Sequence, residues 1–172
     1  PVYLRRKREQ VLTELPEKTE VLDWCEMTKQ EQETYVNSFT DSSNLMAVRR
    51  VSWNVDDLKY SSKANRLLEI VENAKLENRK VLVFSFFLDT IAKVKSLFGD
   101  KCYGPICGGV SGTKRQEIID EFENGESGSV LVSQITSGGF GLNIQAASVV
   151  VICEPQFKPS TENQAISRCY RM

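Results

Sequence analysis

The sequence contains no histidine among its 172 residues. This absence excludes a Ser-His-Asp triad and a histidine general base. The five cysteines are scattered and include no C-x-x-C pair, so the common zinc patterns are nearly excluded as well. We therefore expect no metal site, and we expect the cysteines to be buried, reduced thiols of an intracellular protein.

Long apolar runs and strong net charge are also missing. No apolar run approaches the ~18 residues of a membrane span, and no signal-peptide pattern opens the chain, so we expect no membrane partner. The net charge is −1, which means that any nucleic-acid-binding surface must be local.

A phosphate-binding G-x-x-x-x-G-K-[ST] loop is absent too. The glycines Gly138, Gly139 and Gly141 are not followed by Lys-Ser or Lys-Thr. On their own, such glycines more often mark plain loop geometry than a ligand site. No magnesium-binding aspartate pattern occurs either. We therefore expect that this chain alone neither holds nor hydrolyses ATP.

What the sequence does contain, from residue 80 onward, is an alternation of short apolar runs and amphipathic segments. The predicted strands cover 80–87, 101–109, 129–134 and 148–155, and the predicted helices cover 88–99, 113–125 and 160–172. Thr113 is the expected cap of the second helix, and Ser160 and Thr161 are the expected caps of the last. Continuous apolar strands that alternate with helices predict an α/β fold with a parallel sheet.

The carboxyl ends of parallel strands meet at one edge of the sheet, where ligands usually bind. The segments expected at this edge are Ser85, 108–111, 134–143 and 154–159. We therefore predict the binding site there.

The first 60 residues lack the alternation of strand and helix patterns seen in the rest of the sequence. Residues 20–27 form an apolar run of strand length, and Thr28 with Glu31 predicts a capped helix start. Residues 41–60 are polar and irregular with Trp53 as their only large anchor, so we expect a loop or a mobile segment. We divide the chain into a leading, linker-side segment (1–60) and a core lobe (61–172).

The core lobe opens with a long amphipathic helix over residues 61–79. Its expected buried edge consists of Leu67, Leu68, Val71, Ala74 and Lys75.

Two arginines, Arg168 and Arg171, close the predicted last helix. At a spacing of three they share one helix face, and the guanidinium group suits bidentate contacts with phosphate. On an arbitrary helix such a pair is more often a pair of surface arginines bonded to acids. Their position after a C-terminal strand edge favours phosphate binding.

Six segments in order resemble the second RecA-like lobe of a Swi/Snf-type superfamily-two helicase, a DNA-translocating ATPase. They are LRRKREQVLTELPEKTE (4–20), SSKANRLLEIV (61–71), KVLVFSFF (80–87), GGVSGTKRQEIIDEF (108–122), VSQITSGGFGLNIQAASVVVICEP (132–155) and NQAISRCYRM (163–172). The third, fifth and sixth are similar to helicase motifs IV, V and VI. The resemblance implies a RecA-like, P-loop NTPase-type sheet that lacks its own phosphate loop.

The resemblance also implies roles for single residues. Arg168 and Arg171 match the arginine fingers of motif VI. The residues that would face ATP are Gln164, Gly139, Gly141 and Asn143. The residues that would contact the DNA backbone are Ser85, Ser111, Gln134 and Gly138. Gln134 departs from the family pattern, which usually has serine or threonine at that position.

The resemblance further implies cofactors and partners. ATP and magnesium would be held mostly by an N-terminal lobe, which is one expected partner, and double-stranded DNA is the other. The chain ends one residue after Arg171, where the family continues with Gly-Gln, so we expect a part of a longer protein. The EPQFKP segment (154–159) departs from many remodellers and favours the bacterial cytoplasm over a eukaryotic nucleus.

Two alternatives stay open at this point. The chain could be the second lobe of another superfamily-two enzyme, such as an RNA helicase, or a non-enzymatic α/β interaction module. The leading LRR segment and GGFGLNI (138–144) favour the DNA translocase.

Overall fold

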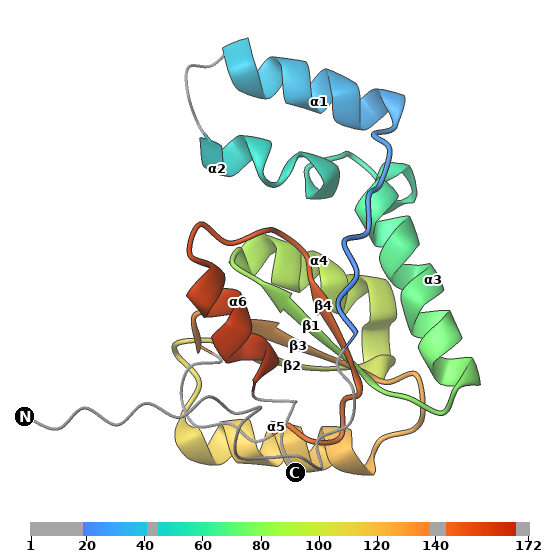
Figure 1. Ribbon diagram of the computed structural model, residues 1–172, viewed down its shortest axis with the longest axis vertical. Coiled ribbons are helices and arrows are strands. Elements are labelled where there is room, and N and C mark those ends of the chain that lie inside the picture. The colour runs from blue at the N-terminus through green and yellow to red at the C-terminus, as the bar shows by residue number, and fades with distance from the viewer. Residues whose placement is uncertain (1–18, 41–44, 138–143, 168–172) are drawn as a thin grey trace, which may run out of the picture.

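A single sheet of parallel strands forms the centre of the molecule (Figure 1). The computed structural model describes residues 19–40, 45–137 and 144–167. The strands are β1 (Val81–Ser85), β2 (Cys102–Ile106), β3 (Val130–Gln134) and β4 (Val149–Ile152), in the order β2-β3-β1-β4. All three pairings are parallel, which confirms the predicted α/β fold.

Helices cover both faces of this sheet (Figure 1). They are α3 (Ser62–Leu76), α4 (Leu88–Phe98), α5 (Gly112–Asn124) and α6 (Pro159–Ile166). Val83 of β1 belongs to the core cluster that includes α3 and α4, whereas Leu82 belongs to the cluster that includes α5 and Ala165 of α6. Because successive strand residues point to opposite faces, the first four residues of β1 are all apolar, and all five of its residues, including Ser85, are buried.

The predicted helix boundaries are confirmed at some ends and wrong at others. Gly99 follows α4 with a φ of +53°, a conformation that favours glycine at a helix end. At the start of α5 the prediction of Thr113 is wrong, because the Ser111 side chain accepts the cap hydrogen bond from the Lys114 amide at 3.3 Å. The prediction of Ser160 and Thr161 as caps of α6 is also wrong, since this helix begins at Pro159.

The segment before the core differs from the prediction in one respect and agrees in another. Residues 20–27 are not a strand, and their large apolar side chains Val21, Leu22 and Trp24 are exposed. The capping box is confirmed, because the Thr28 amide donates to the Glu31 carboxylate at 2.6 Å at the start of α1 (Lys29–Thr40). The prediction of a strand over residues 20–27 is therefore wrong, whereas the predicted start of the helix at the cap motif is confirmed.

Residues 45–60 are more regular than the predicted loop. They form the short helix α2 (Leu45–Val48) and the 3-10 turns Val51–Trp53 and Leu58–Tyr60, and α1 and α2 project beyond the sheet (Figure 1). Trp53 is 1% exposed and packs in the core cluster with α3 and α4, so its role as an anchor is confirmed.

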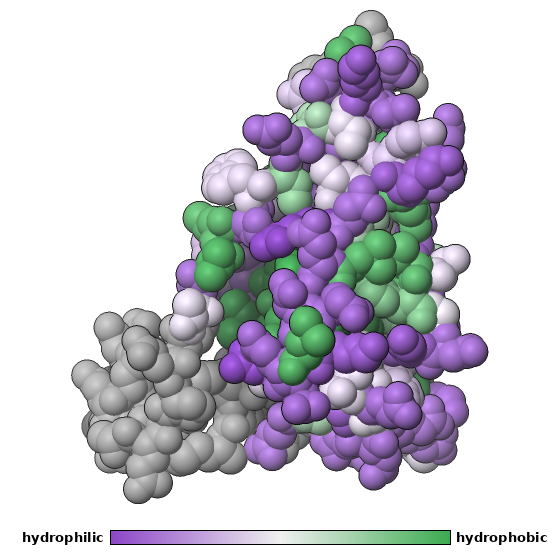
Figure 2. All heavy atoms as spheres, turned by 90° about the vertical axis from the view of Figure 1, so that its right-hand side faces the viewer, coloured by the Kyte–Doolittle hydropathy of each residue, from purple (hydrophilic) through white to green (hydrophobic). Residues whose placement is uncertain are grey.

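The buried edge of α3 is also shifted from the prediction. Leu68 and Lys75 are exposed, and the buried residues are Ala64, Leu67, Val71 and Ala74. The surface that carries α3 is mostly hydrophilic, with hydrophobic residues in separate small patches (Figure 2).

Four of the cysteines lie in the described ranges, and all four are free thiols. Cys102 and Cys153 are buried as predicted, whereas Cys25 and Cys107 are half-buried. Burial raises the pKa of the Cys102 thiol to about 12, so this group stays protonated at neutral pH.

Across residues 19–40, 45–137 and 144–167, no helix combines the length and the apolar character that a membrane crossing requires.

Glu31 joins three elements through its buried carboxylate. Besides Thr28, it accepts hydrogen bonds from Ser52 and from the amide and hydroxyl of Ser62, at 2.8 and 2.9 Å. Burial alone would raise the pKa of Glu31, but these hydrogen bonds together outweigh burial and lower the pKa below its ordinary value. The ionised form is therefore the one that the fold stabilises.

We predict that Glu31→Gln lowers the free energy of unfolding at pH 7 by about 1–3 kcal/mol, because a neutral amide replaces an acceptor of several hydrogen bonds. Because folding lowers the pKa of Glu31, its ionised carboxylate stabilises the folded state. This stabilisation is fully present above the ordinary carboxyl pKa and is lost as the pH falls through the folded-state pKa. Urea unfolding should thus show that the difference in free energy of unfolding between Glu31→Gln and wild type is smaller at acid pH than at pH 7. Glu33→Gln, at an exposed position on the same helix, is the matched control.

Candidate functional site

The segments that follow β1, β3 and β4 meet at the carboxyl edge of the sheet, as the sequence predicted. Ser85 ends β1 at this edge, but its side chain is fully buried. Its hydroxyl group lies 3.0 Å from each carboxylate oxygen of Glu154 and accepts a hydrogen bond from the Phe87 amide at 3.1 Å. The Ser85 hydroxyl group is therefore buried beside Glu154, and its contact with DNA stays a prediction.

Gln134 ends β3 and connects two loops of the same edge. Its side-chain amide donates to the Phe86 carbonyl at 3.2 Å, and its side-chain oxygen accepts from the Ser137 hydroxyl at 3.2 Å. The residue is half-buried. Its amide thus holds the loop after β3 against the loop after β1, and its contact with DNA stays a prediction.

Ser111 lies at the amino end of α5 and is exposed. The loop before it is fixed by the buried Arg115, which donates to the carbonyls of Cys107 and Gly108 at 3.1 and 3.5 Å. This arrangement leaves the Ser111 hydroxyl at the surface, at the positive end of a helix dipole where an anion is favoured. Its DNA contact also stays a prediction.

The residues expected to face ATP are described only in part. Gln164 lies on α6 and is exposed, and its backbone carbonyl accepts from the Ser167 hydroxyl at 2.8 Å. The other expected site residues lie outside the described residues: Gly138, Gly139, Gly141, Asn143, Arg168 and Arg171.

Sequence reasoning placed Glu154 in the edge segment 154–159 but predicted neither its burial nor a role for its carboxylate. Glu154 is fully buried, and besides Ser85 it accepts from the Phe86 amide at 3.2 Å. Burial raises the pKa of the Glu154 carboxyl above its ordinary value, although these hydrogen bonds and the charges of Lys63 and Arg49 oppose the increase. A glutamate two residues after the end of an apolar strand was the one available signal.

Sequence reasoning also missed a cation–aromatic group beside this carboxylate. The guanidinium of Arg49 lies 4.6 Å from the centre of the Phe157 ring and 5.7 and 5.4 Å from those of Phe86 and Phe87. Such contacts stabilise by about 0.5–1 kcal/mol each at exposed sites. They join the turn that follows α2 to the loops after β1 and β4.

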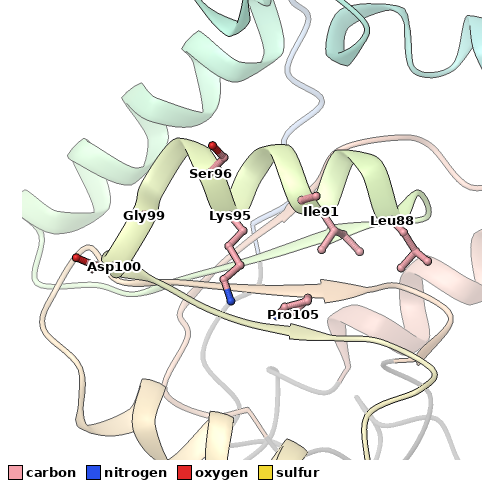
Figure 3. Close-up of a pocket in the computed structure, with 8 residues that line it drawn as sticks. Leu88, Ile91, Lys95, Ser96, Gly99, Asp100 and Pro105 are labelled. Atoms are coloured by element: carbon pink, nitrogen blue, oxygen red, sulfur yellow. The ribbon is translucent and has the colours of Figure 1, made fainter.

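A separate open depression lies between α4 and β2 (Figure 3). Its lining is mainly apolar and includes Leu88, Ile91 and Pro105. Lys95 extends from α4 toward β2 and donates to the Gly104 carbonyl (Figure 3). None of the predicted site residues lines this depression, so the carboxyl edge is the better candidate site.

The described part of the carboxyl edge offers hydroxyl groups, amides and one buried carboxylate. Such groups bind or position a ligand, whereas proton transfer to a reacting group requires an accessible acid or base. In residues 19–40, 45–137 and 144–167, no three histidine, cysteine or carboxylate side chains gather as metal ligands would. The expectation that the chain has no metal site stays a prediction.

The sequence of this chain is similar to those of known helicases. The family model described as helicase conserved C-terminal domain matches residues 62–172. An uncharacterized ATP-dependent helicase, MG018, of Mycoplasma genitalium is 30% identical over 195 residues, a match that covers 100% of this chain and 19% of the relative. The chain thus spans about a fifth of the length of this relative.

Solved structures of ATPase domains share the fold. The C-terminal part of the Fun30 ATPase domain matches with a TM-score of 0.76 and 20% identity, over 92% of this chain and 82% of that one. The SWI2/SNF2 ATPase core of Sulfolobus solfataricus in complex with dsDNA matches with a TM-score of 0.65 and 22% identity, over 86% of this chain and 36% of that one.

Proposed function

The chain belongs to the helicase conserved C-terminal domain family and has the fold of the C-terminal RecA-like lobe of SWI2/SNF2 ATPases, and from that premise we propose that it is the second lobe of a DNA-dependent ATPase. In this proposal the lobe contributes arginine fingers and DNA-backbone contacts to an ATP site that it shares with an N-terminal lobe. The single observation that carries the proposal is the family match over residues 62–172, which includes both arginines.

The proposed ATP site lies at the carboxyl edge of the sheet. Gln164 is exposed on α6, and Ala165 beside it packs into the core. The motif that begins at Gln164 continues through Arg168 to Arg171, so we assign these two arginines to the phosphates of ATP. An arginine at that position neutralises charge on the transferring phosphoryl group in the transition state.

ATP and its magnesium ion would be held mainly by the N-terminal lobe, because no phosphate loop occurs in this sequence. Magnesium bound there would supply positive charge that offsets the negative charge of the phosphates. The lobe formed by the present chain would close on the nucleotide from the side opposite the N-terminal lobe. Closure and opening with each turnover would move the two lobes along the DNA backbone.

Double-stranded DNA is the proposed polymer. The support comes from the Sulfolobus solfataricus relative of the same fold, whose structure is a complex with dsDNA. On this chain, the exposed Ser111 at the start of α5 and the loop after Gln134 are the proposed contacts with phosphate. Contacts of this kind position a protein on DNA without reading its sequence.

The test is steady-state ATP hydrolysis by the complete protein that contains this chain. We predict that duplex DNA raises kcat about tenfold or more over the rate without DNA, because lobe closure on DNA would complete the site. RNA of equal length should have little effect. Stimulation by RNA alone would favour an RNA helicase, and absence of hydrolysis under all conditions would favour the interaction module. The 172-residue chain tested alone should show no turnover above background.

A further inference from the structure

The connection between β4 and α6 is tied to the rest of the lobe at almost every residue. From outside, Lys63 of α3 donates its side-chain ammonium to the Cys153 carbonyl at 2.8 Å. Arg49 donates to the Pro155 carbonyl at 2.5 Å while its guanidinium lies over the Phe157 ring. Two elements remote in sequence therefore hold the backbone of a short loop.

The same connection is also tied internally. The Gln156 amide donates to the Glu162 carboxylate on α6 at 2.6 Å, and the Gln156 side chain donates to the Glu154 carbonyl at 2.7 Å. These bonds fix the loop to the first turns of the helix that it leads into. The position of the loop and the position of α6 are therefore coupled.

Glu154 lies at the centre of this arrangement, and its burial is costly. A carboxylate taken out of water loses its hydration, and the loss is offset only where hydrogen bonds replace it. Here Ser85 and the Phe86 amide replace it, and both belong to the end of the central strand β1. An apolar side chain of similar volume would fill the same space at less cost in stability, so the carboxylate is better explained by the position that it imposes.

The helix that follows has little else to hold it. Ala165 is the one buried residue of α6 within its eight described residues, and a helix of this length is marginal by itself. Burial of an alanine side chain contributes far less than burial of a leucine. The location of α6 at the sheet edge must therefore depend strongly on the connection before it.

We propose that Glu154 is a positioning residue, which holds α6 and the Gln164 side chain at the carboxyl edge through its hydrogen bonds with Ser85 and Phe86. Arg49, in the turn that follows α2, supports the same connection. The catalytic consequence rests on the proposed function, because it requires that α6 carries the phosphate-facing motif. The positioning itself is a property of this chain and can be tested without ATP.

The first test is hydrogen exchange of the α6 amides (159–166) in the 172-residue chain. In Glu154→Leu these amides should exchange about tenfold or more faster than in wild type, because the hydrogen bonds with Ser85 and Phe86 are lost, while the thermal midpoint stays unchanged or rises. Glu154→Gln should restore slow exchange, since its oxygen can accept from Phe86 and its amide can donate to Ser85. Glu117→Leu, at an exposed position on α5, is the matched control.

Three results would overturn the proposal. The first is wild-type exchange of α6 in Glu154→Leu, and the second is equal acceleration in the Leu and Gln variants. The third is acceleration of α6 only in step with the amides of β1, which would mean that Glu154 supports the whole fold. Ser85→Ala provides an independent variant: it removes the donor and should accelerate α6 exchange in the same direction.

The second test concerns the complete protein and separates the two proposals. Glu154→Leu should lower kcat for DNA-stimulated ATP hydrolysis about tenfold with little change in KM for ATP, and Glu154→Gln should retain most of kcat. If the wild-type protein hydrolyses no ATP, the proposed function fails while the exchange result still decides the positioning role. If hydrolysis is normal and Glu154→Leu leaves kcat unchanged, positioning by Glu154 has no part in the reaction.

Discussion

Replacing Arg171 with alanine in the complete protein should lower the kcat of DNA-stimulated ATP hydrolysis by about 10³ or more, the effect expected for an arginine finger. The thermal midpoint and the affinity for duplex DNA should stay near wild type. Arg171→Lys should fail nearly as badly, because an ammonium group cannot reproduce the planar, bidentate fork of guanidinium.

The reason for expecting a functional arginine lies in the local sequence. Arg171 has Arg168 three residues before it and Ser167 four residues before it, so neither position offers an acidic partner. Like charges at this spacing on a helix cost a few tenths of a kcal/mol. If their role in the predicted helix were purely structural, the two arginines would gain nothing from that repulsion, whereas a site that neutralises a phosphoryl group does gain.

The matched control is Arg79→Ala, which removes an exposed arginine whose described ion pair is with Glu77 at 3.0 Å. Surface ion pairs of this type contribute at most about 1 kcal/mol, so kcat should not change. A near-normal kcat for Arg171→Ala would contradict the finger assignment. A large fall in its thermal midpoint would instead mean that Arg171 is a structural residue.

Replacing Trp53 with alanine should lower the free energy of unfolding of the chain by about 3–5 kcal/mol. Trp53 is 1% exposed and fills the space between the segment before α3 and the core cluster on that face of the sheet. Removing the indole leaves a large cavity, and residues 45–60 lose the largest side chain that packs them against the core. Urea unfolding followed by circular dichroism measures the change.

Trp53→Phe should cost much less, below about 1.5 kcal/mol. The indole N–H of Trp53 has no hydrogen-bond partner among the residues that the structure describes. Phenylalanine removes this unsatisfied donor and keeps most of the apolar volume, so part of the loss is recovered. Trp24→Ala is the control, because Trp24 is 89% exposed and should change stability by no more than about 0.5 kcal/mol. Equal losses for the two alanine variants would contradict the assignment of Trp53 as an anchor.

The core of the fold could be predicted because its signals are local. The continuous apolar runs around Val83, Leu131 and Val150 are typical of strands in a sheet covered on both faces, and the turn residues between them mark the helix boundaries; of these strands, β4 is only half-buried. The capping box of Thr28 and Glu31 was equally local, because donor and acceptor lie three residues apart.

The errors concern burial, which depends on distant parts of the chain. Val21, Leu22 and Trp24 have the composition of a strand, but no strand lies beside them in the described part of the chain. Leu68 is apolar and lies at a plausible position on α3, but it faces away from the sheet. Periodicity gives the width of an apolar stripe less accurately than its existence.

The location of the candidate site could be predicted from the sequence, but the contacts among its residues could not. The carboxyl edge follows from strand order, and Ser85 and Gln134 are both found there. The burial of Ser85 could not be predicted, because its partner Glu154 is 69 residues away and a glutamate in a sequence usually indicates a surface position. Arg49 was missed for the same reason, since its aromatic partners come from two other loops.

The strand order β2-β3-β1-β4 has a kinetic consequence. β1 is central, and it pairs with β3 and with β4, so Val81 must find both Val130 and Val149. Pairing of segments so far apart in sequence requires closure of long loops, which slows folding. During synthesis, β4 and the helix after it are the last described elements to emerge. Until they do, the central strand exposes one unpaired edge, and this half-formed sheet is the species most prone to aggregate.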